Sequence, residues 1–162
     1  MAQKDFLVSR TSQVHQIREH LGPRNAVTVT PETKAVDAVI QVCQHPDINT
    51  LAVVDEDTKL LGILEVGRLI DDLLADVLPE GYMRNSVNRD KMMEASFFLT
   101  VHETVEEMMT EPVAITYAYT AEEAFLVLHS NQLRGVPILD ENDRVVSYLG
   151  LLEFLTLWMP GK

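Results

Sequence analysis

Two stretches of the chain, TLAVVDEDTKLLGIL (50–64) and RGVPILDENDRVVSYL (134–149), share one pattern. Each has a short apolar run, a turn rich in acidic residues and a second apolar run, which is typical of a β-hairpin with buried strands. Asp55 aligns with Asp140, so the two stretches are related by a shift of 85 residues. The chain therefore contains an internal repeat, and the repeated unit decides the fold.

The repeat continues on both sides of the two hairpins. Upstream, AVTVTPET (26–33) aligns with PVAITYAYT (112–120), and alternating apolar and polar residues predict a strand with one buried face in each. Downstream, apolar stripes over 66–77 and 151–158 predict a helix in each copy. Apolar residues at helical spacing also precede each hairpin: Ala35, Ala38, Val39 and Val42, then Ala121, Ala124, Phe125 and Leu128. Each copy is therefore an α+β unit with the order strand–helix–strand–strand–helix.

Further helices are predicted over 12–21 and 104–109, one before each copy, and over 90–99. A unit of about 50 residues cannot easily bury its sheet alone. We therefore expect the copies to pack sheet to sheet about a pseudo-two-fold axis, leaving a cleft where small ligands bind. The expected boundaries are 10–78 for the first repeat, 79–99 for an insertion or linker, and 100–160 for the second repeat.

The repeated unit resembles the cystathionine-β-synthase (CBS) domain. The stretch RGVPILDENDRVVSYLGLLEFL resembles the family's core signature of a small residue, Val-Pro, two apolar residues, Asp, a turn, an apolar strand and a helix. VEEMMTEPVAIT resembles the family's opening helix with two methionines, and TLAVVDEDTKLLGILEVGRLI has the core signature with Ala52 in place of the proline. The resemblance implies a tandem CBS pair over about residues 10–77 and 100–159.

The resemblance implies a regulatory module that senses a ligand and is not an enzyme. Pairs of this family form a disc with two clefts that hold AMP, ADP, ATP or S-adenosylmethionine, and two discs commonly associate as a homodimer. We therefore expect a stand-alone sensor with an adenosyl ligand, no resident cofactor and an effector protein whose identity the sequence does not give. The alternative is a structural or interaction module with degenerate clefts.

The second repeat carries the better candidate cleft. In the family, a Gly–apolar–x–Thr/Ser–x–x–Asp signature places the carboxylate on the ribose and the hydroxyl residue, with the helix start, on a phosphate. Here Gly150 replaces the hydroxyl residue and Glu153 replaces the Asp. The resemblance implies these ligand-binding residues: Val113, Ile115, Arg134, Gly135, Val136, Pro137, Gly150 and Glu153. The alternative is that Glu153 is a solvated charge and that 134–137 is an ordinary entry into a strand.

The first repeat carries a weaker second cleft, for which the resemblance implies Thr28, Thr50 and Arg68. Arg68 stands at the carboxylate position, and because a guanidinium has no acceptor it cannot bind the ribose as Asp does. Arg68 either pairs with Glu65, three residues earlier on a helix, or holds a phosphate.

Composition excludes several classes of partner. The 162 residues carry a net charge of −12, with scattered basic residues, so we expect no binding to nucleic acid or to anionic membranes. No apolar stretch reaches the length of a membrane span, and we expect a cytoplasmic protein. The single cysteine, Cys43, and the spacing of the histidines offer neither a metal site nor a catalytic nucleophile.

Overall fold

The computed structural model describes residues 8–70 and 104–158. The first repeat forms a three-stranded sheet in the order β1-β2-β3, in which β1 (Thr28–Val29) runs parallel to β2 (Thr50–Val54) and β3 (Leu60–Glu65) runs antiparallel to it. Helix α2 (Ala35–Gln44) connects β1 to β2, and a further helix begins at Val66. The predicted order of elements is confirmed as far as residue 70.

The second repeat has the same architecture. Strand β4 (Ile115–Thr116) is parallel to β5 (Gly135–Leu139), which is antiparallel to β6 (Val145–Gly150). Helix α6 (Ala121–Ser130) connects β4 to β5, and helix α7 (Leu151–Thr156) follows β6. The predicted α+β fold is confirmed. The helix predicted over 90–99, the rest of the helix predicted over 66–77 and the segment 79–99 lie outside the described residues.

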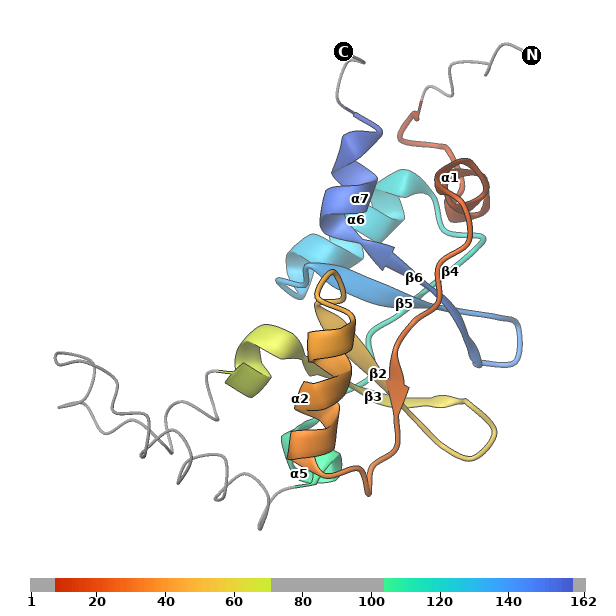
Figure 1. The fold of residues 1–162 in the computed structure, drawn as a ribbon. Coiled ribbons are helices and arrows are strands. Elements are labelled where there is room, and N and C mark those ends of the chain that lie inside the picture. The colour runs from red at the N-terminus through yellow and green to blue at the C-terminus, as the bar shows by residue number, and fades with distance from the viewer. Residues whose placement is uncertain (1–7, 71–103, 159–162) are drawn as a thin grey trace, which may run out of the picture.

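The two helices that precede the repeats are exchanged between them. Helix α1 (Val14–Leu21) packs on the second repeat, where the Val14 amide donates to the Tyr119 carbonyl at 2.8 Å. Helix α5 (Val105–Met108) packs on the first repeat, where the Val105 amide donates to the Thr33 carbonyl at 2.8 Å. Figure 1 shows α1 beside α6 and α7, and α5 beside α2. Each apolar face thus completes the core of the opposite repeat.

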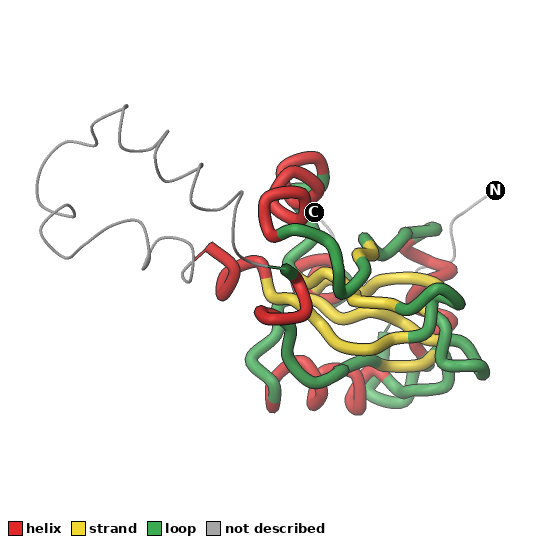
Figure 2. The backbone as a smooth tube through the Cα atoms, turned by 90° about the horizontal axis from the view of Figure 1, so that it is seen from below, coloured by secondary structure: helices red, strands yellow, loops and turns green. Residues whose placement is uncertain are grey.

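The sheets face each other about a pseudo-two-fold axis, as predicted. The Leu60 amide donates to the Asp143 carbonyl at 3.2 Å, and the Val145 amide donates to the Thr58 carbonyl at 3.0 Å. A shift of 85 residues converts the first hydrogen bond into the second, so the two hairpins meet symmetrically. Figure 2 shows the strands of both sheets together in the middle of the molecule, with helices above and below them.

The cores interlock through one large side chain from each repeat. Tyr148 of β6 is fully buried in the core of the first repeat, and Ile63 of β3 is buried in the core of the second. These positions are equivalent under the same 85-residue shift. Burying them across the axis removes apolar surface from water that neither repeat could cover alone. Among the described helices, none is long and apolar enough to cross a bilayer.

Candidate ligand-binding cleft

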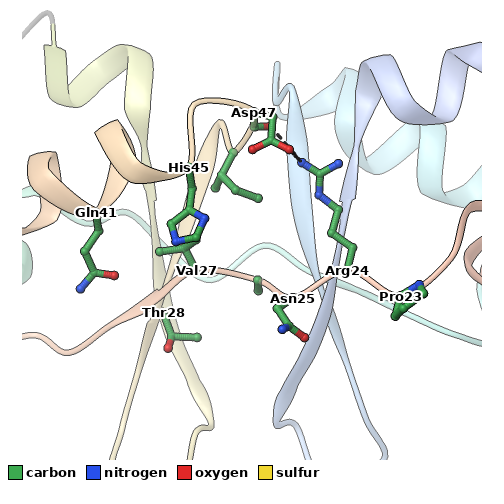
Figure 3. A pocket seen from close by; sticks show the side chains of 10 residues that line it. Pro23, Arg24, Asn25, Val27, Thr28, Gln41, His45 and Asp47 are labelled. Atoms are coloured by element: carbon green, nitrogen blue, oxygen red, sulfur yellow. Dashed lines mark hydrogen bonds and ion pairs between the residues drawn. The ribbon is translucent and has the colours of Figure 1, made fainter.

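A cavity of about 560 Å³ lies beside the first repeat. Two segments line it, the connection from α1 into β1 and the end of α2 with the loop after it. The lining residues are Pro23, Arg24, Asn25, Ala26, Val27, Thr28, Gln41, His45, Asp47 and Ile48. A volume of this size accommodates a ligand as large as a mononucleotide. Figure 3 shows the Arg24 side chain directed toward Asp47, with His45 over Val27.

Local structure explains why these segments enclose a cavity. Gly22 ends α1 with a φ of 88°, a left-handed conformation that favours glycine, and Pro23 prevents the helix from continuing. The chain then runs from the second repeat toward β1. On the other side, the His45 amide closes α2 by donating to the Gln41 and Val42 carbonyls. Both the turn at Gly22 and the end of α2 therefore direct polar side chains toward the same space.

Arg24 connects the cavity to the second repeat. Its guanidinium forms an ion pair with Asp47, and its Nη1 lies 3.6 Å from Glu153 Oε2. The guanidinium carbon lies 5.7 Å from the centre of the Tyr148 ring, a cation–π contact. The Arg24 carbonyl accepts a hydrogen bond from Ser147 Oγ at 2.7 Å. Both the backbone and the side chain of Arg24 are thus held by β6 and α7.

Glu153, the carboxylate of the expected binding signature, is paired with arginines. Arg18 Nη2 donates to Glu153 Oε1 at 2.5 Å, and Arg18 Nη1 donates to Glu153 Oε2 at 3.1 Å. Arg18 also donates to the Gly22 carbonyl at 2.7 Å and to the Tyr148 carbonyl at 2.8 Å. The side chains of Arg18 and Glu153 are 7% and 16% exposed. The interpretation of Glu153 as a solvated charge is therefore wrong, because α1 places a buried arginine against it.

The ion pair determines how Glu153 titrates. Burial raises the pKa of the Glu153 carboxyl, but the hydrogen bonds and charge of Arg18, the Gly150 amide and the charge of Arg24 lower it, and the net pKa lies below the usual range. Glu153 therefore remains ionised at neutral pH. Its two oxygens already accept hydrogen bonds from Arg18, and Oε2 also accepts from the Gly150 amide at 3.3 Å.

Tyr148 of the second repeat fills space beside the first repeat. Its hydroxyl accepts a hydrogen bond from the Asn49 amide at 3.1 Å, and burial raises the pKa of this hydroxyl. A Cβ atom at Gly135 would lie 1.7 Å from the Tyr148 hydroxyl oxygen. The glycine of the Arg134–Pro137 run is therefore needed because the tyrosine ring occupies the adjacent space.

The structure separates the residues expected in the better cleft. Glu153 does not line the cavity but contacts Arg24, which does, and the Gly150 amide donates to Glu153. Four of the others are buried in the second sheet: Ile115, Gly135, Val136 and Pro137. Arg134 is exposed and Val113 is partly buried against the second core. Pro137 lies on the central strand of the sheet, where its missing amide costs no hydrogen bond to β4, because β4 pairs only with Ile138 and Leu139.

The residues expected in the weaker cleft also separate. Thr28 lines the cavity. Thr50 is buried, and its hydroxyl donates to the Gly135 carbonyl at 2.8 Å. Arg68 is exposed on the helix that begins at Val66.

Sequence reasoning missed the polar residues that line the cavity. These are Arg24, Asn25, Gln41, His45 and Asp47, together with Arg18 behind them. The available signal was Arg18 on α1, a charged residue next to the apolar face of Val14 and Ile17. An arginine flanking a buried stripe requires a carboxylate partner, and Glu153 is the acidic residue of the otherwise apolar α7.

Comparisons with known proteins identify the family to which this fold belongs. The model of the CBS domain matches residues 19–75 and 104–157, and the chain therefore belongs to the CBS domain family, with two repeats. Similar solved structures include a CBS domain-containing protein from Thermotoga maritima (TM-score 0.70, 20% identity, 95% of this chain and 99% of that chain). A comparison with curated proteins finds no match.

Two of the similar structures contain adenosyl ligands. The CBS domain pair of protein MJ0100 was solved in complex with 5′-methylthioadenosine and S-adenosyl-L-methionine (TM-score 0.65, 20% identity, 91% of this chain and 96% of that chain). CBSX2, a CBS-pair protein of Arabidopsis thaliana, was solved in complex with AMP (TM-score 0.63, 22% identity, 90% of this chain and 94% of that chain). At these identities the likeness establishes the shared fold.

Proposed function

We propose that this CBS pair is a regulatory module that senses an adenosine-containing ligand bound in the cavity between residues 23–28 and 41–48. The observation that carries the proposal is the position of the cavity: Arg24 lines it, and Arg24 Nη1 lies 3.6 Å from Glu153 Oε2. Glu153 stands at the carboxylate position of the family's binding signature. The adenosyl ligands of the two similar structures support this ligand class.

Sensing follows from the way the cavity is built. Its walls come from the segment that connects α1 to β1, and α1 packs on the opposite repeat. A ligand that binds one arrangement of the two repeats more tightly shifts the molecule toward that arrangement. An effector protein would then detect the change in the relative position of α1 and the repeats.

Isothermal titration calorimetry with AMP, ADP, ATP and S-adenosylmethionine tests the proposal. We expect heat of binding and a raised melting temperature with at least one of the four. Gln41→Trp, which fills the cavity from its wall, should abolish both signals. Ile40→Trp is the matched control, since Ile40 is half exposed on the same helix and does not line the cavity. The absence of binding heat and of a shift in melting temperature with all four ligands at millimolar concentration would contradict the proposal.

A second candidate function is a structural module whose cleft binds nothing. The observation that favours it is the Arg18–Glu153 pair, which already satisfies the carboxylate that a ribose would need. This candidate predicts that the wild type binds none of the four ligands, whereas Arg18→Gln, which frees Glu153, gains binding of at least one. Binding by the wild-type protein would exclude it.

We also propose a homodimer formed through α6 and α7. Five large apolar side chains of α6, α7 and the turn after α7 remain exposed: Phe125, Leu126, Leu152, Leu155 and Trp158. An apolar group of this extent on a helical face favours association. Sedimentation velocity should give a dimer for the wild type and a monomer for Leu152→Asp, and a monomeric wild type would contradict the proposal.

A further inference from the structure

We propose that the cavity selects a ligand that carries a phosphate group, and that this phosphate replaces the Asp47 carboxylate on the Arg24 guanidinium. The inference rests on the proposed function and narrows its ligand class. Arg24 is then the anion-binding residue, and the Asp47 carboxylate occupies the position of the anion when no ligand is bound.

The Arg24 guanidinium is held in place without the help of Asp47. It lies over the Tyr148 ring at 5.7 Å, and its Nη1 is 3.6 Å from Glu153 Oε2. Its side chain is only 21% exposed, and the Ser147 hydroxyl fixes its carbonyl. A guanidinium anchored in this way keeps its position when its other partner leaves, so its remaining donors are preorganised for an anion.

Asp47, by contrast, is easily displaced. Its side chain is 67% exposed, and its carboxylate interacts with Arg24 across the rim of the cavity. Ion pairs that involve an exposed side chain contribute little free energy, because water solvates the freed carboxylate well. A ligand that offers a stronger anion at the same place therefore displaces Asp47 at low cost.

The charges around the cavity favour a phosphate over a cation. Glu153 is neutralised by the bidentate contact with Arg18, so the charge of Arg24 is balanced mainly by Asp47. Once Asp47 has moved, Arg24 presents a positive charge to the cavity. A phosphate dianion accepts two parallel hydrogen bonds from a guanidinium, whereas S-adenosylmethionine offers only a singly charged carboxylate and carries a sulfonium and an ammonium that Arg24 repels.

The neutral polar lining fits the rest of such a ligand. Asn25, Thr28 and Gln41 supply amide and hydroxyl groups that donate to phosphate oxygens or accept from ribose hydroxyls. His45 also lines the cavity, opposite the segment that carries Arg24. Recognition therefore does not require Glu153 to leave Arg18.

Calorimetric titrations of AMP, adenosine and S-adenosylmethionine into four proteins test the inference. The proteins are the wild type, Arg24→Gln, Asp47→Asn and the control Asp57→Asn, which removes an exposed carboxylate at the far end of the β2–β3 hairpin. We expect the wild type to bind AMP at least about tenfold more tightly than adenosine or S-adenosylmethionine. Arg24→Gln should lose about tenfold in AMP affinity and leave adenosine within about twofold.

Asp47→Asn is the sharper test, because the exposed side chain can change without disturbing the fold. It should bind AMP about threefold or more tightly than the wild type, since the competing anion is gone, while Asp57→Asn should not differ from the wild type. Weaker AMP binding by Asp47→Asn, equal affinities for AMP and adenosine, or a parallel loss of adenosine binding in Arg24→Gln would overturn the inference and leave the proposed function standing. Failure of every ligand to bind would overturn both.

Discussion

The hydroxyl of Thr50 donates a hydrogen bond to the carbonyl of Gly135 at 2.8 Å, and the two residues are 85 positions apart. They are therefore equivalent residues of the two repeats, joined across the pseudo-two-fold axis. The asymmetry of the contact lies in the side chains, because Thr50 supplies a donor and Gly135 supplies space for Tyr148. The two repeats thus place different side chains at equivalent positions beside the axis, and Tyr148 fills the space that Gly135 leaves open.

Gly135→Ala should destabilise the protein by about 2 kcal/mol or more, measured by urea unfolding. The added methyl group would meet the Tyr148 hydroxyl oxygen at 1.7 Å, and the buried ring has no room to move away. Gly67→Ala is the control, since nothing lies within 4 Å of its added methyl and the residue is helical. That change should stabilise by about 0.5–1 kcal/mol. Equal stability of the Gly135→Ala variant and the wild type would show that the centre repacks.

Thr58→Asn should raise the free energy of unfolding by about 0.5–1 kcal/mol. Thr58 has a φ of 64° at the tip of its hairpin, and a β-branched side chain is strained in this left-handed region whereas Asn tolerates it. The equivalent residue, Asp143, adopts a φ of 61° with a side chain suited to it. Asp143→Asn should therefore leave stability nearly unchanged, and an equal gain at both positions would refute the explanation.

The fold was predictable from the repeat, whereas most of the cavity was not. The 85-residue repeat and the alternation of Val27 and Val29 with polar residues are visible in the sequence itself, and they predict the strands and their order. The cavity depends on α1 crossing to the second repeat, and no pattern in residues 12–21 specifies which repeat the helix covers. The position of Arg24 beside Glu153 follows from that crossing, so the sequence predicted the carboxylate and missed its partners.

Ile17→Ala should destabilise the whole molecule by about 2–4 kcal/mol, although Ile17 precedes all strands of the first repeat in the chain. The side chain is fully buried in the core of the second repeat, so its truncation leaves a cavity there. Ile40→Ala, at a half-exposed isoleucine, should cost no more than about 1 kcal/mol. Hydrogen exchange should show faster opening in α6 for Ile17→Ala but not for Ile40→Ala. Faster exchange limited to α1 would mean that the helix docks without supporting the core.

The free energy of unfolding should depend on pH through the ion pair between Arg18 and Glu153. Because the pKa of Glu153 is lower in the folded protein than in the unfolded chain, its ion pair stabilises fully above the unfolded value of about 4.5. This stabilisation is lost as the pH falls through the lower, folded value, where the carboxylate takes up a proton. Glu153→Gln should therefore cost about 3 kcal/mol at pH 7, and its deficit relative to the wild type should shrink below pH 4.5.

A control and a double mutant separate the ion pair from other effects of acid. Glu122→Gln removes a carboxylate whose side chain is 54% exposed and should leave the pH profile nearly parallel to that of the wild type. Glu153→Gln in an Arg18→Met background should cost much less than in the wild type, because the buried charge that it orphans is then absent. Urea unfolding measured between about pH 3 and pH 7 covers the transition. If the deficit of Glu153→Gln were the same at both ends of this range, or if the two substitutions were additive, Arg18 would not be the partner that holds the carboxylate ionised.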